Sequence, residues 1–350
     1  MNSGSGGGPA DADEAASRAG DEAASQAGDD GASQARDDGA NPRVSGRWVA
    51  RQILGRALLP HHVFRWLRRR REHRRVATVH ANAQLALYNR MLPGDFLHYG
   101  YFEDPDTPPE AISFDAIHRA QTRYAEQIAS LIEHPDEPIL DAGCGMGGML
   151  GLLGATGHDV TGLTPDRFQA DHIRNTYPGI PVLRCRLEDI NVDKYMAYFG
   201  TIIHAESLQY MDADGVFAVL DKIMAQSGTW IVADYFRVAA AAGRASRSGW
   251  RLDAFRARLR EHGYTVAHEA DITANVLPTL GFALLLAHRI ALPALDFAHD
   301  KLRAKTPALH YVLENVAERA RDAAIRSAAV LDPAGFAAHK RYLLMKIRKT

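Results

Sequence analysis

PILDAGCGMGGML, residues 138–150, is the stretch that decides the fold of this chain. A short apolar run ends at Asp141, four glycines follow, and an apolar run then resumes. The pattern predicts a buried strand, a tight turn and the start of a helix. Glycines let the backbone pass close to a ligand, and a helix start presents unpaired N–H groups. We therefore expect a ligand-binding turn of the kind that dinucleotide sites use. The glycines are Gly143, Gly145, Gly147 and Gly148.

Beyond this turn, apolar segments of strand character alternate with helical intervals. The alternation predicts an α/β fold, a Rossmann-like sheet of seven mostly parallel strands with helices on both faces. Because ligands of such sheets bind at the carboxyl ends of the strands, the site is expected there. Helical patterns over 77–91 and 114–133 precede the sheet, and the domain is expected to span 77–350. The strands are predicted at 139–141, 159–163, 181–184, 201–205, 230–234, 265–269 and 341–349.

A chain of 350 residues is long enough to bury a large core, and its charge is balanced, with a formal net charge of −1. Two cysteines, Cys144 and Cys185, provide neither a disulfide framework nor the spacing of zinc ligands. We therefore expect a reducing, cytoplasmic setting. The acidic start of the sequence argues against a secretory signal.

The charge is unevenly distributed over the first 76 residues. Residues 1–42 carry nine acidic side chains and two arginines and repeat an eight-residue unit (DEAASRAG, DEAASQAG, DDGASQAR), so we predict a disordered acidic tail. Residues 43–75 carry eleven arginines and one glutamate among large apolar residues. We expect an arginine-rich amphipathic segment at 43–76 that packs on the domain, holds an anionic substrate or makes peripheral contact with an anionic membrane. No recognised module indicates specific nucleic-acid binding.

The string DAGCGMGG, which begins at Asp141, resembles the first motif of class I S-adenosylmethionine (SAM) dependent methyltransferases, D/E-x-G-x-G-x-G. The later strand-end motifs stand at the expected distances, and the resemblance covers residues from about 80 to 350. It implies that SAM is the cofactor and that Asp141, Gly143 and Gly145 hold it. A nicotinamide-binding protein is less favoured, because the second strand ends in VTGLT without an acidic residue.

The strings after the second and third strands resemble a subgroup of these enzymes. GLTPDRFQ is similar to the GITLSxxQ of the cyclopropane-fatty-acid, tocopherol and isoprenoid methyltransferases, which implies that Thr164 and Gln169 contact SAM. CRLEDI resembles the segment that wraps the adenine, with Leu187 and Glu188 at its edge. A carboxylate there accepts a hydrogen bond from the adenine amino group.

Two further strings carry the residues that the resemblance places near the reacting atoms. In HAESLQYM, Glu206 matches a carboxylate that stabilises positive charge and takes a proton. Tyr210 stands where several O- and C-methyltransferases keep a histidine base, and the string instead resembles the E-S-S-x-Y of terpenoid diphosphate C-methyltransferases. FLHYGYFED resembles the H-x-G-Y-F/W segment that covers SAM, with Tyr101 as the best match and Tyr99 as the next. An aromatic face attracts a sulfonium, whereas His98 is expected to cap a turn.

Residues 272–337 interrupt the alternation and are predicted to be helical and apolar, with Pro278 and Pro293 breaking them into short helices. The segment resembles the cap of tocopherol-like methyltransferases, which implies an apolar substrate. A dimer contact or plain core packing is the alternative. Its longest apolar run, 276–287, is too short for a membrane span and indicates a buried or lid helix.

Together these features predict a SAM-dependent methyltransferase that acts on an apolar small molecule, such as an isoprenoid, lipid, quinone or polyketide-like compound. An enzyme of the cyclopropane-fatty-acid type is one alternative. A non-catalytic membrane-surface or scaffold protein with a cofactor-type fold is another. No metal is expected, because Asp296 and Asp300 alone are two carboxylates on a helix face.

Overall fold

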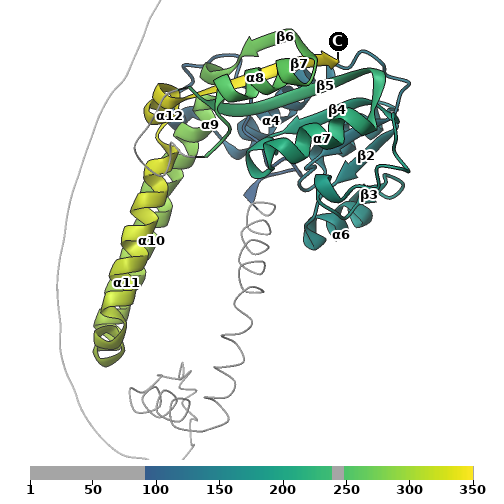
Figure 1. The fold of residues 1–350 in the computed structure, drawn as a ribbon. Helices are drawn as coiled ribbons and strands as arrows, with labels where there is room; N and C mark the ends of the chain where they lie inside the picture. The colour runs from purple at the N-terminus through teal and green to yellow at the C-terminus, as the bar shows by residue number, and fades with distance from the viewer. Residues whose placement is uncertain (1–90, 239–247, 350) are drawn as a thin grey trace, which may run out of the picture. The chain divides into compact units, whose positions relative to one another are not determined.

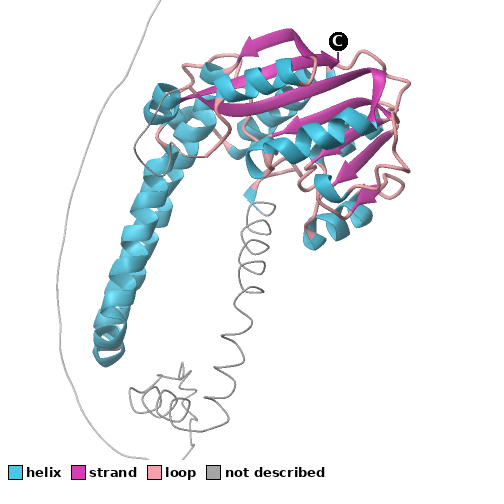
Figure 2. Cartoon of the chain, viewed as in Figure 1, coloured by secondary structure: helices cyan, strands magenta, loops and turns pink. Residues whose placement is uncertain are grey.

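The computed structural model describes residues 91–238 and 248–349 (Figure 1). The predicted acidic tail, the arginine-rich segment and residues 77–90 of the first predicted helix lie outside these ranges. Within them, strands and helices alternate to form one sheet with helices on both faces (Figure 2). This arrangement confirms the predicted α/β, Rossmann-like fold.

Seven strands form the sheet in the order β3-β2-β1-β4-β5-β7-β6. Strands β1 to β5 pair in parallel, and β7 runs antiparallel between β5 and β6. Asp141 pairs with Gly162 on one side and with Ile203 on the other. The segments that follow β1, β2 and β4 therefore meet at one edge of the sheet. The strands are β1 Ile139–Ala142, β2 Val160–Leu163, β3 Val182–Leu183, β4 Phe199–Ala205, β5 Met224–Arg237, β6 Tyr264–Asp271 and β7 Lys340–Lys349.

Helices cover both faces of the sheet because successive strand residues point to opposite sides. Ile202 packs in a core with Phe217 of α7 and Phe255 of α8. The next residue, Ile203, packs in a second core that includes Tyr124 of α4. Helices α5, α9 and α12 also contribute to this second core. The helices are α4 Phe114–Ala129, α5 Gly148–Ala155, α6 Arg167–Thr176, α7 Ala213–Ile223, α8 Leu252–Glu261, α9 Thr273–Leu286, α10 Leu292–Lys305, α11 Pro307–Ala328 and α12 Pro333–His339.

Side-chain caps fix the start of several helices. The Ser113 hydroxyl accepts from a backbone N–H at the start of α4, and the carboxylates of Asp166, Asp212 and Asp332 do the same for α6, α7 and α12. Such caps satisfy backbone donors that have no partner within the helix. Two of the four, Asp166 and Asp212, stand at the strand edge where a ligand is expected.

The predicted helical insertion lies between β6 and β7. It contains α9, a π-helical turn at Ala287–Ala291, and then α10, α11 and α12. The predicted breaks at Pro278 and Pro293 are wrong, because both lie within one continuous helix of 33 residues that runs over Thr273–Lys305. By length and composition alone this helix is long and apolar enough to cross a membrane, unlike the shorter run that the sequence suggested.

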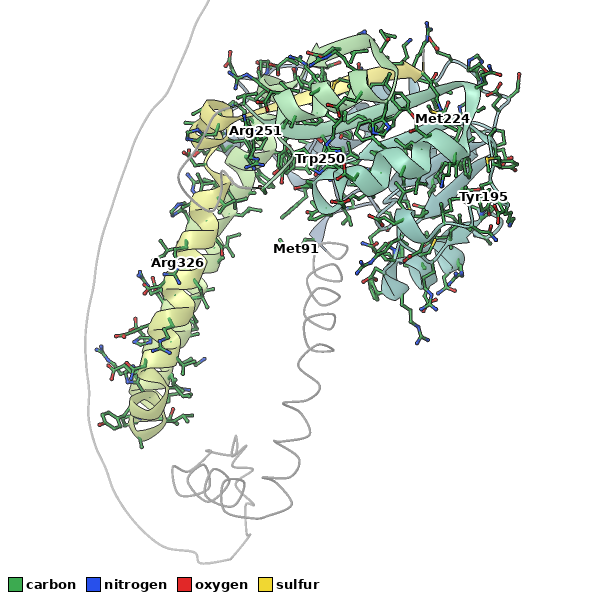
Figure 3. All side chains as sticks on the ribbon, viewed as in Figure 1. Met91, Tyr195, Met224, Trp250, Arg251 and Arg326 are labelled. Carbon is green, nitrogen blue, oxygen red and sulfur yellow. The ribbon has the colours of Figure 1, made fainter. Side chains whose placement is uncertain are left out.

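The two ends of this long helix have different surroundings. Val276 and Leu280 of α9 are buried against the sheet. By contrast, no residue of α10 is buried, and Phe297 is 65% exposed. Side chains such as Arg326 extend from α11 along its length (Figure 3). We conclude that α9 belongs to the core, and that α10 and α11 contact each other through pairs such as Arg321 with Asp296, at 2.7 Å.

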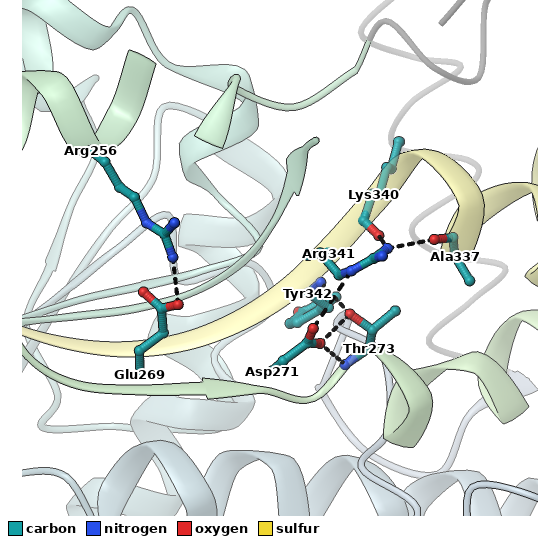
Figure 4. A network of polar contacts seen from close by, with 8 residues as sticks. All are labelled: Arg256, Glu269, Asp271, Thr273, Ala337, Lys340, Arg341 and Tyr342. Atoms are coloured by element: carbon teal, nitrogen blue, oxygen red, sulfur yellow. Dashed lines mark hydrogen bonds and ion pairs between the residues drawn. The ribbon is translucent and has the colours of Figure 1, made fainter. Parts of the chain in front are cut away.

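A polar network joins the two ends of the insertion to the sheet (Figure 4). The Asp271 carboxylate accepts from the backbone N–H and hydroxyl of Thr273 at the start of α9. The Thr273 hydroxyl in turn accepts from the backbone N–H of Tyr342, at 2.8 Å. Arg341 donates to the carbonyls of Ala337 and Lys340. The start of α9 and the start of β7 are thus held together.

Candidate active site

A cavity of about 810 Å³ lies at the carboxyl ends of β1, β2 and β4. It is lined by segments that follow these strands, by the 95–98 segment before α4 and by 186–188 after β3. Nine of the ten residues predicted for the site line it. They are Asp141, Gly143, Gly145, Thr164, Gln169, Leu187, Glu188, Glu206 and Tyr210.

The glycine turn has the predicted strand, turn and helix geometry. Gly143 adopts φ 93° and Gly145 φ 55°, in the left-handed region that favours glycine. A Cβ at Gly143 would lie 2.4 Å from the Cβ of Ser207, so a side chain does not fit there. Helix α5 begins after the turn, with Gly147 as its N-cap and no side-chain cap. Its first backbone N–H groups are therefore not satisfied by a capping side chain.

Asp141 is the buried acid at the base of this turn. Its side chain is 2% exposed, and its Oδ2 atom has no hydrogen-bond partner among the described residues. Burial raises the pKa of Asp141 to about 7. A buried carboxylate without a partner is costly, so this oxygen is well suited to a ligand that brings a positive charge or a donor.

The charge of the cavity as a whole is strongly acidic. Six carboxyl side chains line it, against the one guanidinium of Arg186. A cleft that is lined by charges of one sign and has low-dielectric walls concentrates ions of the opposite charge. The cavity therefore favours a cationic ligand. The carboxyl groups are those of Asp95, Asp141, Asp166, Glu188, Glu206 and Asp212.

Thr164 and Gln169 form the wall that follows β2. The Thr164 hydroxyl donates to the Gln169 amide oxygen at 2.5 Å, and Thr164 is 1% exposed. Because Asp166 caps α6 through the backbone N–H of Gln169, the glutamine is fixed at the helix start. The opposite wall holds the 3₁₀ turn Leu187–Asp189, in which Leu187 is buried.

Glu206 follows β4 directly and has a strained backbone, with φ 54°. Its Oε1 atom accepts from the backbone N–H of Tyr99 at 2.8 Å and from the Tyr342 hydroxyl at 2.7 Å. Burial raises the pKa of Glu206 to about 7, and these two donors partly oppose the rise. A carboxyl group with a pKa near 7 is suited to exchange a proton at neutral pH.

A chain of phenols extends from Glu206 into the core. The hydroxyl groups of Tyr342 and Tyr124 lie 2.7 Å apart, and Tyr124 is the donor of this bond because the Tyr342 proton goes to Glu206. The carbonyl of Ala233 lies 3.1 Å from the Tyr124 hydroxyl as a second acceptor. Both tyrosines are buried. The chain fixes the orientation of the Glu206 carboxylate, because the donor that it receives is itself held in place.

Tyr101 does not line the cavity, unlike the other nine predicted residues. Its backbone N–H donates to the carbonyl of Ala120 at 2.8 Å, which holds the residue against α4. Tyr99, the second match in the sequence, contacts Glu206 instead through its backbone N–H. Tyr210 lines the cavity and is 83% exposed, so it is not packed under a lid among the described residues.

His98 lines the cavity as a neutral group. Its Nδ1 atom lies 2.8 Å from the carbonyl of Tyr99, so Nδ1 carries the proton. Burial lowers the pKa of His98 to about 4. The Nε2 atom is buried and has no partner among the described residues.

Several residues of the site were not predicted from the sequence. Tyr124 and Tyr342 fall within a predicted helix and a predicted strand, where an aromatic residue ordinarily indicates core packing. Asp234 is 1% exposed near Glu206, and burial raises its pKa to about 8. The sequence carries no signal for these contacts, because they depend on the placement of β7 beside β5.

The described residues form a Rossmann-like sheet with a cavity at the carboxyl ends of its strands. No known protein-family model matches the chain. A protein named O-methyltransferase from Pyrenophora dematioidea is 37% identical over 87 residues, which cover 24% of this chain. The matched segment spans 31% of that relative.

Among solved structures, the fold is similar to a C-methyltransferase, a cyclopropane synthase and a cyclase. Geranyl diphosphate C-methyltransferase from Streptomyces coelicolor A3(2) aligns at TM-score 0.54 and 15% identity, over 77% of this chain and 98% of that one. The mycolic acid cyclopropane synthase CmaA1 aligns at 0.54 and 16%, over 78% and 98%. The [4+2]-cyclase SpnF aligns at 0.53 and 17%, over 78% and 92%. At these identities the likeness establishes the fold.

Proposed function

We propose that this chain is a SAM-dependent methyltransferase that acts on an apolar small molecule. The observation that carries the proposal is the acidic cavity, with the unpartnered Oδ2 atom of buried Asp141 beside a glycine turn that admits no Cβ at Gly143. A cation with an amino-acid end suits both features. Two of the three similar structures, those of geranyl diphosphate C-methyltransferase and CmaA1, are named as complexes with S-adenosylhomocysteine, which supports the same ligand type here.

Different residues of the cavity would bind different parts of SAM. Asp141 and the backbone N–H groups at the start of α5 would hold the amino-acid end of SAM. Thr164 and Gln169 would contact the ribose side, and Glu188 would accept from the adenine amino group. Nine predicted residues line one cavity, and this supports a single nucleoside-containing ligand.

Glu206 is the group proposed to act on the acceptor. SAM, when bound, supplies an activated methyl group on a sulfonium, so the protein mainly aligns the reactants and excludes water. Both donors to Glu206 engage its Oε1 atom, and no partner engages Oε2 among the described residues. Oε2 would therefore stabilise positive charge on the acceptor or take the proton that the acceptor loses.

Aromatic side chains next to Glu206 support an apolar acceptor. The ring of Tyr99 lies 5.9 Å from that of Tyr342 and 6.3 Å from that of Phe336. The ring of Tyr235 lies 5.6 Å from that of Phe336. Phe336 belongs to α12, so the insertion contributes to this aromatic group. The four aromatic residues lie beside the 810 Å³ cavity and are not among the residues that line it.

A cyclopropane-forming enzyme is the second candidate, because CmaA1 shares the fold. Gln209 bears on this choice, since it stands near the position where the fatty-acid family keeps a glutamate for bicarbonate. Here the Gln209 amide oxygen accepts from the Tyr235 hydroxyl, and its amide nitrogen donates to the carbonyl of Glu206 at 3.4 Å. An amide in place of that carboxylate favours simple methyl transfer.

Mass spectrometry tests the proposal. The full chain is incubated with methyl-deuterated SAM and a lipid extract, and the products are searched for the added label. We expect a labelled apolar product that Glu206→Gln fails to form while it still binds S-adenosylhomocysteine. Asp193→Asn, at an exposed acid away from the cavity lining, is the control and should form it. Full turnover by Glu206→Gln would remove Glu206 from the mechanism.

A further inference from the structure

Strand β7 carries five basic residues, and four of them have carboxylate partners. Arg341 lies near Asp271, Lys346 and Arg348 pair with Glu133, and Lys349 lies near Asp221. Lys340, the first residue of the strand, is the exception: no carboxylate among the described residues lies within ion-pair distance of its Nζ atom.

Lys340 is nevertheless buried, with 5% of its surface exposed. Its ammonium donates to the Ser248 hydroxyl at 2.8 Å and stands 4.0 Å from the ring centre of Tyr235 and 5.4 Å from that of Phe336. An ammonium has three N–H donors, and one is used here among the described residues. Burial lowers the pKa of Lys340 to about 8, and the negative charge of nearby Asp234 opposes this only in part. Such a group is costly to the fold unless an anion completes it.

The surroundings of Lys340 connect it to Glu206. Tyr235, whose ring faces the ammonium, donates through its hydroxyl to Gln209, and Gln209 donates to the carbonyl of Glu206. On the other side, Phe336 contacts the ring of Tyr99, whose backbone N–H is held by Glu206. The aromatic group of Tyr99, Tyr235 and Phe336 therefore separates a carboxylate from an ammonium.

We propose that the Lys340 ammonium binds an anionic oxygen group of the acceptor. The acceptor is then an apolar molecule with one anionic end: its apolar part lies against the aromatic group, its reacting atom lies at Glu206, and its anionic end lies at Lys340. This inference rests on the proposed methyltransferase function and narrows its substrate class. Lys340 acts as a specificity residue, because it selects the acceptor by charge.

Binding of paired probes to the full chain, saturated with S-adenosylhomocysteine, tests this inference. Octanoate and octanol share one chain and differ in charge, and ligand-detected NMR measures the affinity of each. We expect octanoate to bind about tenfold more tightly than octanol, as for a hydrogen bond to a charged group. Lys340→Met should abolish this preference and Lys340→Arg should retain most of it. Lys346→Met, which removes a paired lysine of the same strand, should leave it unchanged.

Two results would overturn the inference: equal binding of octanoate and octanol by the unmodified chain, or an undiminished preference in Lys340→Met. The comparison of octanoate with octanol uses the unmodified chain, so it can overturn the inference even if Lys340→Met does not fold. Octyl phosphate, run in parallel, identifies whether a phosphate or a carboxylate is the better anionic end. If the unmodified chain does not bind S-adenosylhomocysteine, the proposed function itself is refuted.

Discussion

At the scale of single residues, the site gathers buried carboxyl groups at the ends of neighbouring strands. Burial raises the pKa of Asp141 and Glu206 to about 7 and that of Asp234 to about 8. Each of these carboxyl groups therefore holds its proton more tightly in the folded chain than in the unfolded one. The site therefore opposes folding at neutral pH and is suited to a cationic ligand that offsets the negative charge.

The stability of the ligand-free chain should therefore depend on pH. A raised carboxyl pKa adds stability below the unfolded value, near 3.8 for Asp141, and this stability is lost as pH rises through about 7. We expect Asp141→Asn to raise the free energy of unfolding at pH 8 by about 2 kcal/mol while it abolishes S-adenosylhomocysteine binding. Denaturant unfolding at pH 5 and pH 8 measures this. Asp193→Asn is the exposed control, and lower stability of Asp141→Asn at pH 8 would contradict the account.

The hydrogen bond from the Tyr342 hydroxyl should lower the pKa of Glu206. Because its hydrogen bond favours the charged carboxylate and lowers the pKa of Glu206, its removal should raise that pKa above 7. Carbon-13 NMR titration of labelled glutamate in Tyr342→Phe measures this shift. Tyr264→Phe removes a hydroxyl that bonds to Asp221 instead, and it should leave Glu206 unchanged. An unaltered titration of Glu206 in Tyr342→Phe would show that the bond does not form.

At the scale of elements, the positions of the strands in the sequence were predictable and the packing between distant segments was not. All seven strands were predicted, because apolar runs and turn residues are local signals. Strand β5 nevertheless begins at Met224 rather than at 230 and runs through Ser227 and Gly228. Pro278 lies within α9, whose apolar side chains are buried on the sheet. Tertiary packing overrides the local preference in both places.

The segment before α4 shows the same limit. It was predicted to contribute Tyr101, but its backbone contacts place Tyr99 at Glu206. The buried side chain of Gln121 donates to the carbonyls of Phe96 and His98, at 3.3 and 2.8 Å. No local pattern in the sequence specifies which side of the segment faces α4, so neighbouring tyrosines could not be told apart.

Gln121 should therefore hold the segment in place. We expect Gln121→Leu to speed amide hydrogen exchange over residues 96–101 by about tenfold, because two buried carbonyls lose their donor. Mass spectrometry of exchanged peptides measures the effect. Gln127→Leu, at an exposed position of the same helix, is the control. Equal exchange in both variants would show that the segment is held by other contacts.

At the scale of the whole molecule, we propose that the chain is a cytoplasmic protein that contacts anionic membranes through residues 43–76. The eleven arginines of residues 43–75 suit such a surface, and an apolar acceptor dissolves in it. We expect the full chain to co-sediment with vesicles containing phosphatidylserine, less so as salt rises. Replacing the four arginines at 68–71 by glutamate should weaken this several-fold. Equal sedimentation of both proteins would contradict the proposal.

Binding of SAM in the cavity beside the glycine turn is the property on which the proposed function depends. Calorimetric titration of the full chain with S-adenosylhomocysteine tests it most directly. We expect saturable binding to one site, and loss of binding in Gly143→Val, where a side chain would meet Ser207 and strain a left-handed backbone. Absence of binding by the unmodified chain, or full binding by Gly143→Val, would contradict it.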